Sequence, residues 1–321
     1  MRRSLIVTVV LATVLMRGGY ARADDALAKA NAALQTGNAD DARALLNSLP
    51  ATAEVHNLNC RVQFSLEHFD AAVTECEAAV RTNSENSDYH MWLGRALGEK
   101  ASRASFMSAF SLAKRVCAEF EAAARLDARN AAALADLGEF YASAPGVVGG
   151  GTDKAARVAT QLDGIDPVRA HELRGRIAET QKDTGTAERE FRQALSVSTH
   201  PAFQWMTLSS FYRRRAQWSE LDAAIDSGVK AAQHDRHAGV ALFNGASVLT
   251  KANRNLSLSA KMLEDYLASS SPTEDAPAFV AYTRLAKIRN QLGDIPGAKD
   301  ARARALALAH DYKPAQDLKI Q

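Results

Sequence analysis

The chain has 321 residues, of which 47% are apolar, and its 39 basic residues stand against 37 acidic ones. This is the composition of a folded protein with enough apolar material for a core, and it excludes an intrinsically disordered chain. The formal net charge is only +2. Because charges of both signs are interspersed, the sequence lacks the basic stripe that nucleic-acid binding requires, and we expect no nucleic-acid partner.

Residues 1–23 have the pattern of a secretory signal peptide. Arg2 and Arg3 precede a mostly apolar run over residues 5–16, and Ala21-Arg22-Ala23 forms an A-x-A cleavage site. The apolar run is too short for a membrane-spanning helix, and no later segment is long enough, so we expect no membrane span in the mature chain. We predict cleavage after Ala23 and a periplasmic or secreted protein. Cleavage would leave 35 basic against 37 acidic residues.

Three cysteines follow the predicted cleavage site, namely Cys60, Cys76 and Cys117. An exported compartment permits disulfides, and an odd number leaves at least one thiol without an intrachain partner. Cys60 and Cys76 would lie on the two helices of one hairpin, which makes them the favoured pair. The alternative is that all three are small core residues, because free cysteine is among the most buried residue types.

A helix pair recurs along the mature chain every 30 to 44 residues. Its first half has large apolar residues and a small residue at helical spacing, and its second half starts from a small or apolar residue. The first half is clear at His90-Leu93-Gly94-Leu97, Leu134-Leu137-Gly138-Tyr141 and Trp205-Leu208-Ser209-Tyr212, with a weaker copy at Tyr282-Leu285-Ala286. The second half starts at Ala42, Ala72, Val116, Ala155, Ala187, Leu221, Ala260 and Ala298.

These residues resemble the tetratricopeptide repeat family, whose 34-residue unit is a helix-turn-helix with the pattern W-x2-L-G-x2-Y, then A-x3-F and a closing Pro. The middle of the chain, W-L-G-R-A-L-G-E-K-A from Trp92 and D-L-G-E-F-Y from Asp136, looks like a group of exported bacterial proteins of this family whose activity is unassigned. The match is weaker in the first, second and seventh units, and in the second unit Glu67 takes the place of the usual turn glycine.

The resemblance implies an all-α fold in which helix-turn-helix repeats stack into a right-handed superhelical solenoid with contacts between nearest neighbours only. We predict about eight hairpins over residues 24–312, with insertions near 98–108 and 144–152. Asn130, Asp166-Pro167 and Asp294 with Pro296 mark helix starts, and Gly37 and Gly293 mark turns. Residues 313–321 form a tail, and we expect the segment from His310 with Tyr312 and Leu318 to cap the last apolar face.

The first insertion predicts a helix that extends about three turns beyond its neighbours. Phe106, Met107 and Phe110 could form a projecting apolar lip for a partner. The alternative, which we favour because large exposed apolar patches are uncommon, is that the extension folds back and buries these side chains.

The second insertion contains Gly149-Gly150-Gly151 before Thr152. Backbone N–H groups at such a helix start can bind an anion, but the loop is not a phosphate-binding P-loop because Thr152 stands where Lys is required. We favour an inserted turn in which Thr152 caps the helix and Asp153 interacts with the helix dipole.

No catalytic motif is present. His171-Glu172 lacks the second histidine of H-E-x-x-H, and His234 with His237 has no clear third metal ligand. We therefore predict no enzyme activity, no catalytic residue, no metal site and no cofactor, and expect the two histidines to lie in solvent before the seventh unit. An enzyme with an unrecognised site stays an alternative.

The concave surface of the solenoid is the predicted binding site. It should be lined by first-helix residues, and because several are arginines, which pair well with carboxylates, we expect a protein or peptide partner, with an acidic segment as the favoured class. The alternatives are a small or polymeric anionic ligand, such as a cell-wall fragment, and ordinary solvated charges. The predicted lining residues are Asn57, Arg61, Met91, Arg95, Glu139, Arg176, Met206 and Arg213.

Overall fold

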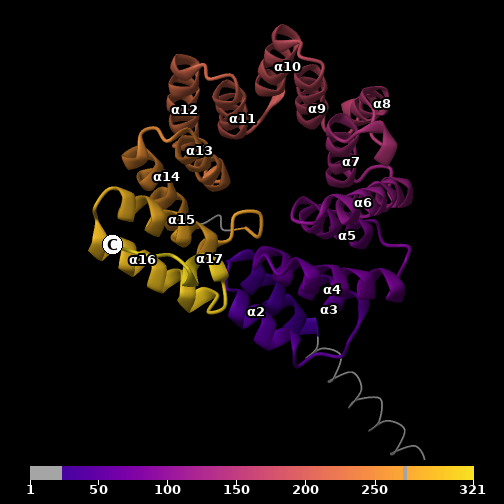
Figure 1. Cartoon of the computed structure of the whole chain (residues 1–321), viewed down its shortest axis with the longest axis horizontal. Helices are drawn as coiled ribbons and strands as arrows, with labels where there is room; N and C mark the ends of the chain where they lie inside the picture. Colours follow the sequence, from indigo (N-terminus) through magenta and orange to yellow (C-terminus); the bar gives the residue numbers. More distant parts are fainter. Residues whose placement is uncertain (1–23, 270–272) are drawn as a thin grey trace, which may run out of the picture.

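The computed structural model describes residues 24–269 and 273–321, and every regular element in these residues is helical. The predicted signal peptide lies outside the described residues. Helices follow one another in antiparallel pairs joined by short turns, as the sequence predicts. In Figure 1 the pairs follow one another round a ring, and in the pairs at the top of the view one helix lies toward the middle and its partner toward the outside.

The inner, or first, helices are residues 24–35, α3 (Ala53–Ser65), α5 (Ser87–Ser102), α7 (Ala131–Ser143), α9 (Pro167–Thr180), α11 (Pro201–Arg214), α13 (Gly239–Ala252) and α15 (Ala278–Gln291). The second helices are α2 (Ala39–Leu46), α4 (Phe69–Thr82), α6 (Phe106–Leu126), α8 (Thr152–Asp163), α10 (Thr184–Val197), α12 (Trp218–Ala232), α14 (Leu256–Ala268) and α16 (Ile295–Leu308). A 3-10 turn, η1 (Gly146–Val148), precedes α8, and a short α17 (Lys313–Gln316) follows α16.

Local sequence signals set many of the helix boundaries. Asn130, Asp166 and Asp294 are N-caps whose side chains accept hydrogen bonds from backbone N–H groups of the first turn, as predicted. Gly37 and Gly293 occupy turns at φ 70° and 80°, a region that only glycine enters without strain. The equivalent turn after α3 has Glu67 at φ 61°.

Cys60 on α3 and Cys76 on α4 form a disulfide, with Cα atoms 5.1 Å apart. The bond joins the two helices of one hairpin, so the favoured pairing is confirmed and the alternative that all three cysteines are free is wrong. Cys117 on α6 is free and buried. Burial and the neighbouring Glu121 raise the pKa of its thiol to about 11, so it is an unreactive core residue at neutral pH.

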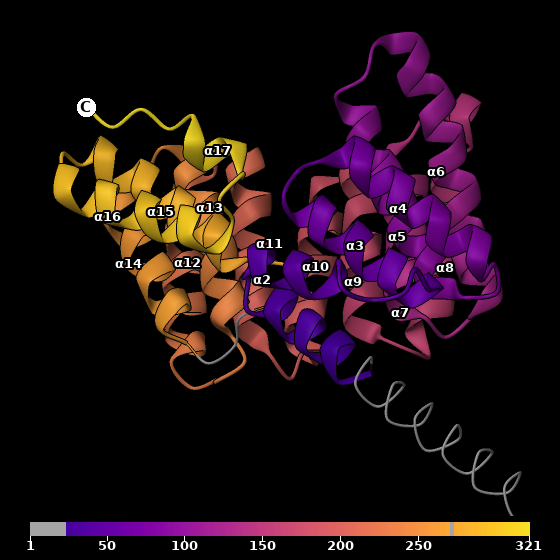
Figure 2. The same cartoon turned by 90° about the horizontal axis from the view of Figure 1, so that it is seen from below.

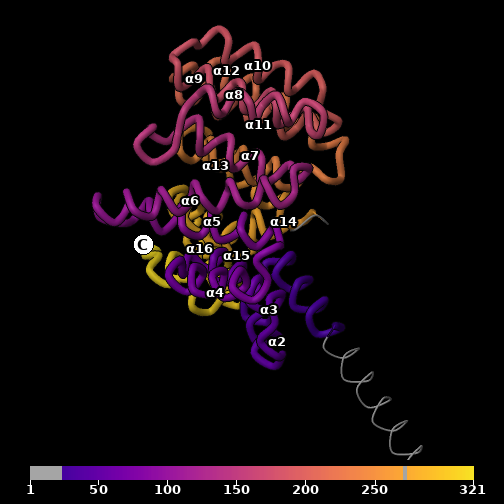
Figure 3. The backbone as a smooth tube through the Cα atoms, turned by 90° about the vertical axis from the view of Figure 1, so that its right-hand side faces the viewer, coloured from indigo at the N-terminus to yellow at the C-terminus, as the bar shows by residue number. Residues whose placement is uncertain are grey.

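The first and last helix pairs pack against each other and close the ring. Leu34, Leu46 and Leu66 share one buried apolar cluster with Phe279 and Tyr312. Figure 1 shows the yellow C-terminal helices returning to the indigo N-terminal ones, and Figure 3 shows the two ends side by side from a second direction. Contacts are therefore not confined to nearest neighbours, which corrects the sequence-based expectation.

Polar contacts accompany the closure. Arg43 on α2 pairs with Asp311 at 2.5 Å, and the Tyr312 hydroxyl donates to Glu67 at 2.9 Å. The segment after α16 thus fills the junction between the two ends, with Tyr312 and Ala315 in the shared cluster. The expectation that it covers only the last apolar face was too narrow, because its principal buried residues contact the first units.

Candidate functional site

A pocket of about 240 Å³ lies between α9, α11 and α13, on the inner helices of the ring. Its apolar wall consists of Phe203, Met206 and Val248. Its polar wall has hydroxyl and amide groups that can donate or accept hydrogen bonds, together with three cations. These polar residues are Arg176, Thr207, Ser210, Arg213, Asn244, Ser247 and Lys251. We call this cavity the basic pocket.

The basic pocket has three cations and no carboxylate in its lining. Arg176 is neutralised by Glu179 at 3.2 Å and Glu139 at 3.7 Å. Arg213 and Lys251 form no ion pair among the described residues, and the Nε of Arg213 is buried without a hydrogen-bond partner. A buried hydrogen-bond donor without a partner costs free energy. The positive charges of Arg213 and Lys251 are also not balanced by a carboxylate in the pocket lining.

Arg284 on α15 adds positive charge beside the basic pocket. It donates to the Ser247 hydroxyl, which lines the pocket, and its guanidinium lies 4.1 Å from the centre of the Phe243 ring. Burial lowers the pKa of Arg284. Tyr312 and Glu67, whose charges act to raise this pKa, lie at the ring junction. No described carboxylate forms an ion pair with Arg284.

A neighbouring cavity, also of about 240 Å³, is acidic. It lies between α7, α9 and α11 and contains Asp136, Glu139 and Glu172 with Arg169 and Arg176. Burial raises the pKa of Asp136, which pairs with Arg95 at 2.5 Å. We call this cavity the acidic pocket; it shares Arg176 and Thr207 with the basic pocket, so the two adjoin along α11.

Four of the predicted lining residues lie in these two pockets. Arg176, Met206 and Arg213 meet in the basic pocket, and Glu139 and Arg176 meet in the acidic one. Met206 is buried in the pocket floor. Their proximity follows from neighbouring inner helices, but their part in binding stays a prediction.

The other predicted residues have intramolecular roles that sequence did not reveal. Arg61 donates two hydrogen bonds to Glu274, at 2.5 and 2.8 Å, across the ring junction, and Arg95 pairs with Asp136 and stacks on Trp92 at 4.8 Å. Met91 is buried in the core. Arg61 and Arg95 thus each already have a carboxylate partner, and their part in ligand binding stays a prediction.

Asn57 and Arg61 line a separate cavity of about 490 Å³ near the start of the described chain. Glu54, Asp88 and Asp24 line the same cavity, so its charge is mainly acidic. The Nδ2 of Asn57 is buried without a partner. This cavity does not suit a carboxylate ligand, because its acidic groups would repel one.

Sequence reasoning missed Asn244, Ser247, Lys251 and Arg284. The first three follow a spacing of three and four residues on α13 and so share one helix face. The seventh unit matches the repeat pattern weakly, which obscured the register of α13. An alignment of Asn244 with Thr207, one unit earlier, would have placed this face on the inner surface.

The turn between α5 and α6 projects from the ring, as Figure 2 shows. Helix α6 has 21 residues and is longer than its neighbours, as predicted. Phe106 and Met107 are 83% and 77% exposed, and Phe110 is 37% exposed beneath the ammonium group of Lys114. The favoured alternative, in which the extension buries these side chains, is wrong. That the lip contacts a partner stays a prediction.

The glycine-rich loop has no free set of N–H groups for an anion. The N–H of Gly149 donates to Gly146, that of Gly150 to Pro145, and that of Gly151 to Tyr141. A Cβ on Gly150 would lie 1.8 Å from a carbonyl oxygen, so the loop is a tight turn. Gly151 is the N-cap of α8, which corrects the prediction that Thr152 caps it; Asp153 lies in the first turn, as expected.

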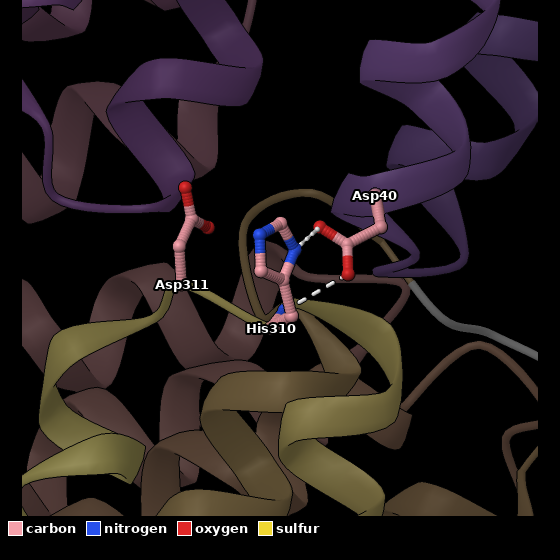
Figure 4. Close-up of side chains that lie close together, drawn as sticks. All are labelled: Asp40, His310 and Asp311. Atoms are coloured by element: carbon pink, nitrogen blue, oxygen red, sulfur yellow. Dashed lines mark hydrogen bonds and ion pairs between the residues drawn. The ribbon is translucent and has the colours of Figure 1, made fainter.

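Asp40, His310 and Asp311 are the three residues in the described chain whose side chains could together ligate a metal ion. Figure 4 shows His310 between the two carboxylates, hydrogen-bonded to Asp40 at 2.8 Å. Asp311 is held by Arg43. Each carboxylate thus has a partner from the opposite end of the chain, and the cluster acts as a clasp across the ring junction.

His234 and His237 are exposed in the connection before α13, as expected. His237 lies with its ring centre 6.1 Å from that of His200, which pairs with Asp235 at 2.7 Å. No helix among residues 24–269 and 273–321 is both long and apolar enough to cross a membrane.

Comparison with solved structures finds other helical repeat proteins. A thermophilic tetratricopeptide repeat protein of Thermus thermophilus is 17% identical at a TM-score of 0.45, over 64% of this chain and 98% of that one. A tetratricopeptide repeat protein of Parabacteroides merdae is 15% identical at a TM-score of 0.39, over 83% of this chain and 96% of that one. A chain of the APC/C hetero-tetramer Cut9–Hcn1 is 14% identical at a TM-score of 0.42. The match covers 89% of this chain and 54% of that one.

No protein-family model matches the chain, and no curated protein matches it. The fold therefore rests on the chain's own helix pairs and their stacking. It is an all-α solenoid of stacked helix-turn-helix repeats. The predicted fold class is confirmed, and a solenoid of this kind presents its inner helices as an extended binding surface.

Proposed function

We propose that this protein is an exported, non-catalytic scaffold that binds a protein or peptide partner on the inner surface of the ring. One observation carries the proposal: the basic pocket has three cations and no carboxylate, and two of the cations, Arg213 and Lys251, have no ion-pair partner in the described chain. A carboxylate of the partner would complete the pocket, because guanidinium groups bind carboxylates in a planar, directional geometry.

Two features support export. The pattern of residues 1–23 is that of a cleavable signal peptide, which favours the periplasm or secretion. The Cys60–Cys76 disulfide supports the same location, since disulfides persist in oxidising compartments and are rare in the cytosol.

Affinity capture from a cell-envelope extract tests this function. The baits are the wild-type protein and an Arg213→Glu/Lys251→Glu variant, in which the basic pocket becomes acidic. The matched control is Arg189→Glu/Lys230→Glu, which reverses two exposed charges on the outer helices α10 and α12. We expect one captured partner that is lost from the pocket variant and kept by the control.

Circular dichroism confirms that all three baits are folded. Equal capture by the wild type and the pocket variant would contradict binding at the basic pocket and direct attention to the Phe106, Met107 and Phe110 lip. Capture of no protein, together with retention of an anionic glycan by the wild type only, would replace the protein partner with a cell-wall fragment.

A further inference from the structure

Beside the basic pocket lies a carboxyl group that also lacks an ionic partner. Glu172 on α9 accepts a hydrogen bond from the Thr207 hydroxyl at 3.2 Å and forms no ion pair with any described residue. The nearest cations are engaged elsewhere, Arg169 with Asp166 and Arg176 with Glu139 and Glu179. Burial raises the pKa of Glu172, and this effect exceeds the opposing effects of hydrogen bonds from Thr207 and Gln204 and of the charges on Arg169 and Arg176.

Glu172 faces the same groove as the unpaired cations. It lines the acidic pocket and a further cavity of about 480 Å³, and both of these adjoin the basic pocket through Thr207. Asn244 and Phe203 line both this further cavity and the basic pocket. The groove along α11 therefore carries an unpaired acid at one end and unpaired bases at the other.

The spacing of these two ends defines a ligand length. Thr207, which contacts Glu172, and Arg213 are six residues apart on α11, which corresponds to about 9 Å along the helix at 1.5 Å per residue. An extended peptide of three residues spans about 10 Å. The apolar side chains of Phe203, Met206 and Val248 line the same pocket, where they can contact a side chain of the ligand.

We propose that the groove binds a short peptide of about three residues with both ends free, its ammonium group at Glu172 and its carboxylate at Arg213 and Lys251. This rests on the proposed function, since it assigns the carboxylate to the same basic pocket, and it adds the recognition of the amino end. Asn244 lines the cavities beside Thr207 and is placed to hydrogen-bond the peptide backbone near its amino end, as an amide side chain both donates and accepts.

Isothermal titration calorimetry of the purified protein with trialanine tests the proposal. The ligands are trialanine with free ends, its N-acetyl form and its C-terminal amide. We expect each blocked form to bind about tenfold more weakly than the free peptide, because each loses one charge-assisted hydrogen bond. The variants are Glu172→Gln and Arg213→Gln, with Arg189→Gln as a control on the outer helix α10.

The pattern across variants identifies each end. For the Glu172→Gln variant, N-acetylation of the peptide should lower the affinity less than about twofold, whereas C-terminal amidation should still lower it about tenfold. For the Arg213→Gln variant, amidation should have the small effect and N-acetylation the large one. Arg189→Gln should behave as the wild type. Absence of trialanine binding, or equal binding of all three ligands, would overturn the inference. If a long acidic peptide still bound through Arg213 and Lys251, the proposed function would stand without it.

Discussion

Gly94 on α5 leaves no room for a side chain, because a Cβ there would lie 2.5 Å from the Phe120 ring of α6. Gly98, one turn later on the same helix, has nothing within 4 Å of its Cβ position. Gly94→Ala should therefore destabilise the protein by about 1–3 kcal/mol through overpacking, despite the better helix propensity of alanine. Gly98→Ala should stabilise it by about 0.5–1 kcal/mol. Urea unfolding of both variants checks this pair, and equal effects would contradict the close approach of α5 and α6.

Single residues also show how far sequence predicts the site. Gly94 and Gly138 could be identified as points of close helix packing, because the repeat pattern specifies a small residue there. Whether each arginine has an ion-pair partner could not be predicted from the sequence. Arg61 and Arg213 have the same residue type and the same predicted role, yet Arg61 pairs with Glu274, more than 200 residues away in the sequence, and Arg213 has no such partner. Ion pairs between distant units depend on the closed shape, which local patterns do not encode.

At the scale of the elements, several turns within the helix pairs contain one residue in the left-handed conformation, but the type of that residue differs from turn to turn. Gly293 has φ 80°, whereas Ala216, in the corresponding turn between α11 and α12, has φ 53°. A left-handed conformation costs a residue with a Cβ about 1–2 kcal/mol. Ala216→Gly should therefore raise the free energy of unfolding by up to about 1 kcal/mol, and Gly293→Ala should lower it by about 1–2 kcal/mol. Thermal melts measure both, and destabilisation by Ala216→Gly would contradict the assigned turn geometry.

Helix starts and the disulfide were largely predictable, because caps and hairpin geometry are local. Asn130, Asp166 and Asp294 cap helices where expected, and Cys60 and Cys76 face each other within one hairpin. The lip was not predictable. Whether Phe106 is buried depends on which segment folds over it, and the repeat pattern says nothing of an insertion.

At the scale of the whole molecule, the clasp between the chain ends should depend on pH. Burial would raise the pKa of Asp311, but the hydrogen bond and charge of Arg43 outweigh it and hold the pKa below its ordinary value. A depressed pKa stabilises the folded state above the unfolded pKa of about 3.9, and this contribution is lost as the pH falls through the lower, folded value. Wild type should be more stable than Asp311→Asn at pH 7, and the difference should shrink below about pH 4.

Thermal melts of both proteins at pH 7 and at about pH 2.5 provide the measurement, with Asp300→Asn as the control. Asp300 pairs with Arg304 within the exposed face of α16 and should contribute little at either pH. A stability difference between wild type and Asp311→Asn that stayed constant with pH would contradict the role of the Arg43–Asp311 pair.

Closure of the ring was the part of the fold that sequence could not predict. Each repeat specifies its packing on the next one, but the small rotation per repeat, summed over all of them, decides whether the ends meet. Tyr312 and Leu318 indicated that the tail is buried, without showing that Tyr312 contacts Glu67 in the second unit. The shape of the inner surface, and with it the candidate site, depends on this closure.

A distance measurement between the two ends therefore tests the structure most directly. Spin labels attached through unnatural amino acids at Ala44 on α2 and Ala307 on α16, both exposed, would report it by pulsed electron resonance. Because α2 and α16 are in contact, and packed helices lie about 8–10 Å apart, we predict a single narrow distribution at the short end of the measurable range. A broad distribution at several times that distance would show an open superhelix and contradict the closed ring.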